Sequence, residues 1–336
     1  MPTETKRQYA KRTLLLAIFL TSTLVASSAS ALMAGASPDS PDNRIDIITS
    51  SSPWSGAVAI NIAGNVYSGV LVASRYVLTA AHVASGSTAN PSSLLVIVNV
   101  PGGANAIPAS HIEVFPSFSF PYDDLALIQL STSAPDEAIR YKVQDAVITT
   151  GTNIKLVGYG ASGNGNVGTS VGASASVRRV GENVVDVLTA SIDSSGKTSA
   201  FYLYDFDGPT GKGAMGNGTL GNTRETMVAP GDSGSPAFMT TSNGQTVLMG
   251  INNFATAFSG GTLTYTFGQG GGGMRLSDPR FISWLREKSE YSIRMASDPD
   301  DDVGSAPIPA WALGALAGSL LVLIRRNQGR ALPPAA

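Results

Sequence analysis

At residues 230–236 the sequence reads Pro-Gly-Asp-Ser-Gly-Ser-Pro. The glycines on either side of Asp232 and Ser233 allow the backbone to turn sharply, so that the amides of Gly231 and Ser233 can point at a developing negative charge. The stretch therefore predicts a nucleophilic serine, Ser233, beside an oxyanion hole. Taken alone, it also fits an ordinary surface turn.

Two other segments supply the partners that a serine nucleophile needs, a base and a carboxylate that orients the base. Residues 77–83 read Val-Leu-Thr-Ala-Ala-His-Val, which places His82 directly after an apolar strand. Residues 123–128 read Asp-Asp-Leu-Ala-Leu-Ile, where a carboxylate precedes another apolar strand. Asp123 and Asp124 compete for this role. An isolated histidine is more often structural, and His111 is the only other one.

The order His, Asp, Ser discriminates between hydrolase folds. α/β-Hydrolases run Ser, Asp, His and carry Gly-x-Ser-x-Gly, whereas the residue two after Ser233 is Ser235. The observed order and the Thr-Ala-Ala-His and Gly-Asp-Ser-Gly strings resemble the trypsin (chymotrypsin-like) family of serine proteases. Further points of resemblance are Ser68-Gly69-Val70-Leu71-Val72, Gly158-Tyr159-Gly160 and Gly250-Ile251, and together they cover residues 45–290.

The resemblance implies an all-β fold of two six-stranded antiparallel β-barrels with a short C-terminal helix and the triad in the crevice between the barrels. It implies that Ser233 attacks the substrate, that His82 acts as base and then acid, and that Asp124, which matches the family pattern, orients the imidazole. Asp123 is then expected to face solvent. The oxyanion hole is expected from the amides of Gly231 and Ser233.

In the family, the residue at Asp232 receives a newly freed N-terminal amine and so locks the oxyanion loop. Cleavage between Arg44 and Ile45 would supply such an amine, although Asp46-Ile47-Ile48 follows in place of the usual Val-Gly-Gly. Activation by cleavage at this bond is therefore a hypothesis that the sequence raises.

Substrate specificity is expected to depart from that of trypsin. Met227 stands where cleavage after Lys or Arg needs an acid, and Glu225 would have to shift by two positions to replace it. Asn253, Phe254 and Ala255 align with the strand that pairs with substrate backbone, and Ala255 replaces the usual glycine. With Met227, these residues form the expected substrate-binding set, and a medium apolar residue is expected before the scissile bond.

Composition favours an all-β domain, while the family resemblance implies protein or peptide substrates. The 336 residues include 37 glycines, and 43% are hydrophobic, which allows a sizeable core. The absence of cysteine excludes disulfides, zinc-thiolate sites and cysteine nucleophiles. A net charge of -2 without a basic stripe argues against a nucleic-acid partner. No cofactor is expected, and the protein is expected to be a monomer.

The two ends of the chain read as targeting segments. Residues 1–31 resemble a signal peptide with cleavage after Ala31, and residues 32–44 are a possible propeptide or linker. Residues 291–306 read as an acidic linker, and residues 307–336 as a hydrophobic membrane segment with a basic tail. This C-terminal pattern resembles the PEP-CTERM sorting tails of exported proteins of Gram-negative bacteria, with Pro307-Ile308-Pro309 lacking the usual Glu.

These features predict a periplasmic, cell-envelope or extracellular protein that is anchored in the membrane by its C-terminal segment. The alternatives are an uncleaved N-terminal anchor and a C-terminal helix packed on the domain. Two other functions remain open, a catalytically silent binding module that keeps the protease fold and a secreted esterase with the same triad.

Three smaller features complete the pattern. A capped helix is expected from Asp278-Pro279, with Phe281, Ile282 and Leu285 on one face. Residues 160–172 read as a flexible loop, and the Gly-x-Gly-x-x-Gly string inside them lacks the following helix that dinucleotide binding requires. Asp205 and Asp207 lie in a Gly-rich insertion, but two carboxylates fall short of a calcium site, so no metal is expected.

Overall fold

The computed structural model describes residues 32–192, 198–211, 213–215, 218–258 and 260–299. By internal contacts the chain divides into one unit that ends at Ser297 and a second that begins at Asp298, and only the first is described here. The expected signal peptide and C-terminal hydrophobic segment lie outside the described residues. Within the described ranges, none of the helices has the length and apolar character that a bilayer crossing requires.

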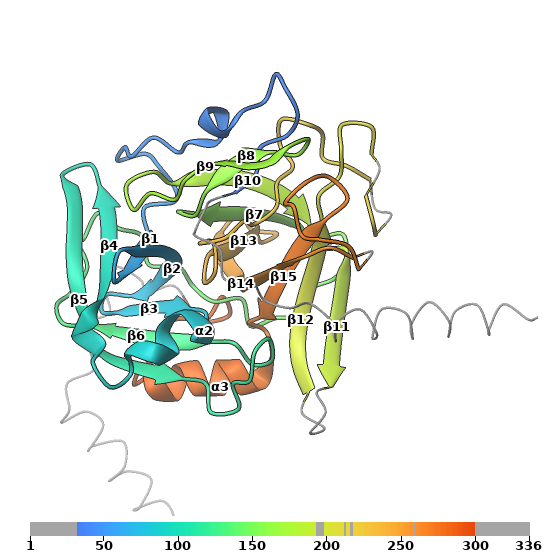
Figure 1. The fold of residues 1–336 in the computed structure, drawn as a ribbon. Coiled ribbons are helices and arrows are strands. Elements are labelled where there is room, and N and C mark those ends of the chain that lie inside the picture. The colour runs from blue at the N-terminus through green and yellow to red at the C-terminus, as the bar shows by residue number, and fades with distance from the viewer. Residues whose placement is uncertain (1–31, 193–197, 212, 216–217, 259, 300–336) are drawn as a thin grey trace, which may run out of the picture. The chain divides into compact units, whose positions relative to one another are not determined.

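Six antiparallel strands close a barrel in the first half of the chain (Figure 1), which confirms one of the expected barrels. Alternate residues of one strand, Leu94, Val96 and Val98, are buried in the barrel core, as a strand with one inward face requires. The strand order is β1-β2-β3-β6-β5-β4. The strands are β1 (Ala57–Ile62), β2 (Asn65–Ala73), β3 (Tyr76–Thr79), β4 (Leu94–Val100), β5 (Gly103–Val114) and β6 (Ala126–Leu130).

The second half forms a seven-stranded antiparallel sheet of order β10-β7-β13-β14-β15-β12-β11, where a second six-stranded barrel was expected. The extra strand, β11, is the outer partner of β12 in a hairpin. No ladder among the described residues closes this sheet, but Asn183 Nδ2 donates to the carbonyl of Asp205 at 2.7 Å. The strands are β7 (Asn153–Gly158), β10 (Arg179–Val184), β11 (Val187–Ile192), β12 (Thr198–Asp205), β13 (Pro236–Thr240), β14 (Thr246–Thr256) and β15 (Gly270–Arg275).

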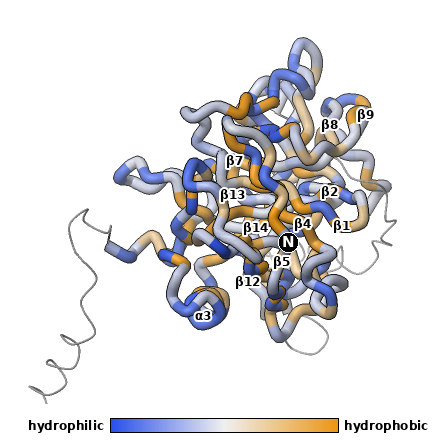
Figure 2. The backbone as a smooth tube through the Cα atoms, turned by 90° about the vertical axis from the view of Figure 1, so that its left-hand side faces the viewer, coloured by the Kyte–Doolittle hydropathy of each residue, from blue (hydrophilic) through white to orange (hydrophobic). Residues whose placement is uncertain are grey.

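Apolar residues gather in the strands of both halves, while the outer loops are mostly hydrophilic (Figure 2). The segment expected to be a flexible loop instead contains a small hairpin of β8 (Ser162–Asn164) and β9 (Gly168–Val171). The glycine string that imitates a dinucleotide motif lies in this hairpin, and no helix follows it. Short helical turns are η2 (Pro41–Arg44), α2 (Ala81–Ala84), η3 (Ser85–Ser87) and η4 (Pro91–Ser93).

The expected C-terminal helix is present as α3 (Pro279–Lys288). The Asp278 side chain caps it by accepting from Arg280 N, and Pro279 occupies the first turn, where its missing N–H costs nothing. Phe281 and Trp284 are buried and meet the ring of Phe115 edge-on at 4.9 and 5.3 Å. The helix is thereby fastened to the loop between β5 and β6.

The packed unit extends beyond both of its expected boundaries. Leu32 and Met33, in the expected propeptide or linker, are fully buried, and Met33 N donates to the carbonyl of Met227 at 3.0 Å. At the other end, Ile293 and Met295 are fully buried, although the acidic linker was expected to begin at residue 291.

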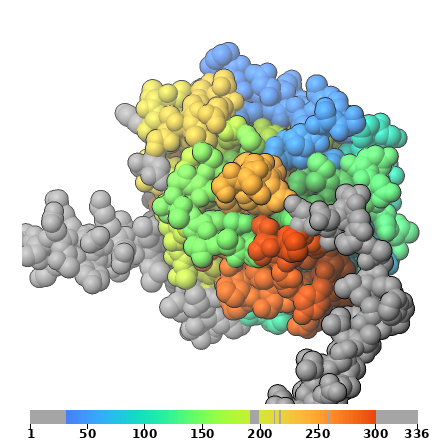
Figure 3. All heavy atoms as spheres, turned by 180° about the vertical axis from the view of Figure 1, so that it is seen from behind, coloured from blue at the N-terminus to red at the C-terminus, as the bar shows by residue number. Residues whose placement is uncertain are grey.

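Residues 32–44 lie against the segment that follows β12, shown from behind in Figure 3 as blue beside yellow. Arg44 is 5% exposed, forms a 2.6 Å ion pair with the buried Asp39, and donates to the carbonyls of Asn222, Arg224 and Glu225. A protease could reach the Arg44–Ile45 bond only after this packing is undone. The Arg44 side chain is therefore held within the fold, and activation by cleavage at this bond stays a hypothesis.

We predict that Arg44→Ala lowers the free energy of unfolding by about 3–5 kcal/mol, because it leaves the buried Asp39 carboxylate unpaired. Arg224→Ala is the control: its side chain is 54% exposed, and loss of its ion pair with Glu182 should cost less than about 1 kcal/mol. Denaturant unfolding of both variants measures the difference. Equal losses would contradict the assigned role of Arg44.

Candidate active site

His82 and Asp124 are joined by two hydrogen bonds. β3 ends at Thr79 and the one-turn helix α2 begins at Ala81, which places His82 at the rim of the first barrel. Nδ1 of His82 lies 2.6 Å from Oδ2 of Asp124, and the backbone amide of His82 donates to Oδ1 at 2.8 Å. The Asp124 side chain is fully buried, whereas 26% of the His82 side chain is exposed. A carboxylate at Nδ1 favours the tautomer whose Nε2 is free to accept a proton.

Asp124 is also held from the second sheet. Asn253 on β14 donates from Nδ2 to the carbonyl of Asp124 at 2.6 Å, and its Oδ1 accepts from Met274 N at 2.9 Å. The Asn253 side chain thus positions the loop that carries Asp124. Its expected role in pairing with substrate backbone stays a prediction.

Asp123 does not face solvent, and that expectation is wrong. It is fully buried, its φ is +49°, and its carboxylate forms an ion pair with Arg280 of α3 at 3.1 Å. The hydroxyls of Ser117 and Ser199 donate to the same carboxylate at 2.5 and 2.9 Å. A buried charge needs such partners. Although Asp123 and Asp124 are adjacent in the chain, their carboxylates therefore lie in two separate hydrogen-bond networks.

Ser233 lies in a loop that packs against the end of β3. This end of β3 is the part of the strand that precedes His82 in the chain. Gly231 and Gly234 have φ values of +92° and +83°, which L side chains rarely adopt. A Cβ at residue 234 would lie 2.0 Å from Thr79 Oγ1 and 3.0 Å from Ala80 N. Ser233 is itself only partly buried. The fold thus brings the loop of Ser233, the predicted nucleophile, against the segment that leads into His82.

Ser68 on β2 fixes this loop, a role that the sequence did not reveal. Its amide donates to the carbonyl of Ser233 at 3.1 Å, and its hydroxyl donates to the carbonyl of Gly231 at 3.1 Å. The same hydroxyl accepts from Tyr159 N, and the Ser68 carbonyl accepts from Thr79 Oγ1 at 2.8 Å. Ser68 therefore constrains both residues whose amides are the expected oxyanion hole.

Asp232 is fully buried and is held without a new N-terminal amine. Its carboxylate accepts from Ala229 N at 3.0 Å and from Gly160 N at 3.2 Å. Burial raises the pKa of Asp232, and the two amides and Arg179 lower it. The amide of Ile45 donates instead to the carbonyl of Asp42. Two backbone amides thus bind the Asp232 carboxylate, and its role as the lock of the oxyanion loop stays a prediction.

The expected substrate-binding residues do not all lie at the surface. Met227 is fully buried in a hydrophobic cluster that also contains Leu32 and Tyr204, whereas Phe254 and Ala255 are partly exposed. Phe120, which the sequence did not single out, presents its ring edge-on to His82 at a centroid distance of 5.2 Å. No local motif marks such an aromatic residue in a loop.

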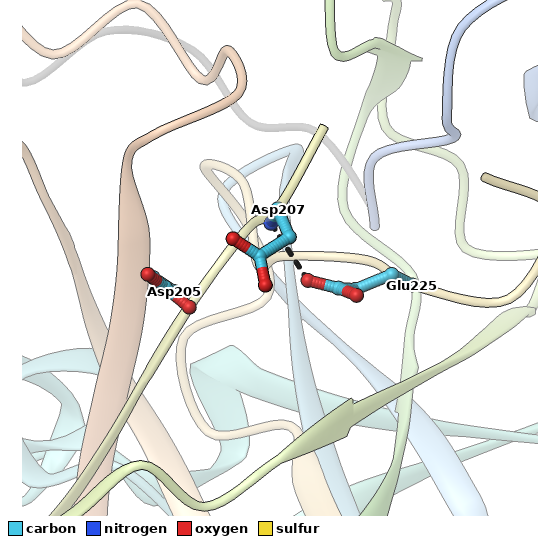
Figure 4. Close-up of side chains that lie close together, drawn as sticks. All are labelled: Asp205, Asp207 and Glu225. Carbon is cyan, nitrogen blue, oxygen red and sulfur yellow. Dashed lines mark hydrogen bonds between the residues drawn. The ribbon is translucent and has the colours of Figure 1, made fainter. Parts of the chain in front are cut away.

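The structure also gathers three carboxylates, where the sequence pointed to two. Asp205, Asp207 and Glu225 place one oxygen each within 4.8 Å of one another (Figure 4). Burial and the neighbouring Asp205, Glu225 and Asp186 raise the pKa of Asp207 to about 7. Glu225 therefore belongs to this cluster.

Comparison with known protein families agrees with the fold. The family described as Trypsin matches residues 46–268, which is more than half of the chain. The chain therefore belongs to the trypsin family of serine peptidases. No curated protein matches the chain.

We predict that Ser68→Ala lowers kcat for a peptide substrate by about tenfold or more with a smaller change in KM, because the oxyanion loop loses its anchor. The buried groups left without a partner should lower the free energy of unfolding by about 1–3 kcal/mol. Ser110→Ala is the control, since this exposed hydroxyl bonds only to strand carbonyls far from the loop in sequence. Unchanged kcat in Ser68→Ala would contradict the assignment.

Proposed function

We propose that this protein is a serine endopeptidase that cleaves peptide bonds in protein or peptide substrates through an acyl-enzyme, with Ser233, His82 and Asp124 as its triad. The observation that carries the proposal is the pairing of the partly exposed His82 with the fully buried Asp124. Packing of the Ser233 loop against the end of β3 supports it.

The proposed reaction follows from these roles. Ser233 Oγ attacks the peptide carbonyl while His82 takes its proton, and Asp124 stabilises the resulting imidazolium. The amides of Gly231 and Ser233 donate to the oxyanion of the tetrahedral intermediate. His82 then gives its proton to the leaving amine, and water repeats the sequence to release the acid and restore Ser233.

We further propose that cleavage follows a medium apolar residue. Met227 occupies the position where a basic side chain would need a carboxylate. Glu225 cannot readily substitute, because its oxygens accept hydrogen bonds from Asp207 N, Leu220 N and the Thr219 hydroxyl. Ala255 in place of glycine adds a methyl group to the partly exposed strand β14.

The proposal includes export and a membrane anchor. It rests on the signal-peptide pattern of residues 1–31 and on the apolar run and arginines of residues 307–336. The proposed location is the periplasm, the cell envelope or the exterior, the proposed state is a monomer, and no nucleic-acid partner is proposed.

We predict that a fluorophosphonate probe labels the protein at Ser233 and that Ser233→Ala abolishes labelling. Asp124→Asn should lower kcat by about 10⁴-fold, because the imidazole takes the wrong tautomer. His111→Ala should change neither, since His111 is exposed and paired with Glu113. Absence of labelling would favour a silent binding module, and hydrolysis of short-chain esters without casein cleavage would favour an esterase.

We predict that a peptide-library profile shows medium apolar residues before the scissile bond, because Met227 replaces the carboxylate that would bind a basic side chain. Cleavage sites are read by mass spectrometry, and the Ser233→Ala variant controls for contaminating proteases. A profile dominated by Lys or Arg would overturn the specificity proposal and leave the triad untouched.

A further inference from the structure

The three carboxylates at the end of β12 form a compact buried group on the second half of the chain. Asp205, Asp207 and Glu225 are 2–3% exposed, and Figure 4 shows the Asp207 carboxylate between the other two. In the described part of the chain, no lysine or arginine forms an ion pair with any of the three. Three buried acids without a counter-charge are unusual, because isolated charges are costly to bury.

Backbone and hydroxyl donors satisfy only part of the cluster. Glu225 accepts from Asp207 N at 2.6 Å through one oxygen, and from the Thr219 hydroxyl and Leu220 N through the other. Asp205 Oδ2 accepts from Met215 N at 2.6 Å. Oδ1 of Asp207 is buried and has no hydrogen-bond partner among the residues that the structure describes.

This unpartnered oxygen faces the rest of the cluster. A Cβ at Gly213 would lie 1.8 Å from Asp207 Oδ1 and 2.3 Å from Asp205 Oδ2, so both oxygens approach the same point. Any side chain at residue 213 would occupy the space beside them. The glycine thus allows two carboxylate oxygens to converge at a point where no donor from the described residues reaches Asp207 Oδ1.

We propose that Asp205, Asp207 and Glu225 bind a calcium ion. Carboxylate oxygens are the ligands that hard divalent cations prefer, and Ca²⁺ accepts six to eight of them in flexible geometry, with water and carbonyl oxygens completing the shell. The ion would supply the missing partner of Asp207 Oδ1 and the missing positive charge. Magnesium, which demands a strict octahedron and retains several waters, suits a buried site of this kind less well.

The position of the site predicts what the ion does. It would join the end of β12 to the segment that contains Glu225, which leads within two residues to Met227. β12 also carries Tyr202 and Tyr204, whose hydroxyls donate to Asn252 Oδ1 at 2.8 and 3.1 Å. Calcium should therefore stabilise the second sheet, whether or not the protein is a peptidase.

The test uses the full chain carrying Ser233→Ala, so that self-cleavage cannot affect the outcome. Isothermal titration with CaCl₂ should show a single site, and saturating calcium should raise the Tm. Asp207→Asn and Glu225→Gln should each weaken calcium binding by about tenfold or more, because each removes a charged ligand. Glu182→Gln is the matched control: Glu182 is a nearby carboxylate, but it is already paired with Lys155 and Arg224, so its loss should leave calcium binding unchanged.

A second measurement separates lost binding from lost folding. Without calcium, Asp207→Asn should be at least as thermostable as its parent, because it removes repulsion within the cluster, and it should gain little from added calcium. The proposal is overturned if the parent does not bind millimolar calcium, if both cluster variants bind calcium as the parent does, or if Mg²⁺ binds more tightly than Ca²⁺.

Discussion

The buried hydrogen bond between Asp124 and His82 is the constraint on which the rest of the site depends. A carboxylate fully removed from water costs several kcal/mol unless its oxygens are satisfied. Here a single residue satisfies both oxygens, through its ring nitrogen and its backbone amide. The imidazole is therefore fixed in position and tautomer, which is what the proposed role of His82 as a general base requires.

Both halves of the chain contribute to this arrangement. The first barrel supplies His82 and Asp124, and its strand β2 supplies Ser68, which anchors the loop of Ser233. The second sheet supplies Asn253, whose side chain donates a hydrogen bond to the Asp124 carbonyl. Ser68 from the first barrel holds the Ser233 loop, and Asn253 from the second sheet holds Asp124. The site therefore exists only when the two halves are packed together.

Sequence reasoning predicted the proposed triad, and it found α3, because each is written in a short local pattern. The histidine and serine strings, the Asp before a strand and the Asp-Pro cap all depend on neighbouring residues. Burial of Asp123 was missed because its partners, Ser117, Ser199 and Arg280, are scattered along the chain. Glu225 was considered for the substrate pocket, but the fold carries it to Asp205 and Asp207, and no local spacing predicts that meeting.

The packing of residues 32–44 was missed for a similar reason. Residues 32–44 are rich in small and turn-forming residues and look like a linker, yet their side chains pack against segments nearly two hundred positions away. The seventh strand of the second sheet, β11, likewise depends on its pairing with β12. The sequence of this strand pair carries no strong strand alternation. Contacts between distant segments decide both features.

NMR of ¹⁵N-labelled histidine tests the central claim most directly, since His82 and His111 are the only histidines to assign. The structure predicts that His82 carries its proton on Nδ1 and gives a strongly deshielded resonance that persists in Ser233→Ala and is absent from Asp124→Ala. A His82 ring that is protonated on Nε2, or whose Nδ1 signal is unaffected by removal of the Asp124 carboxylate, would contradict the account.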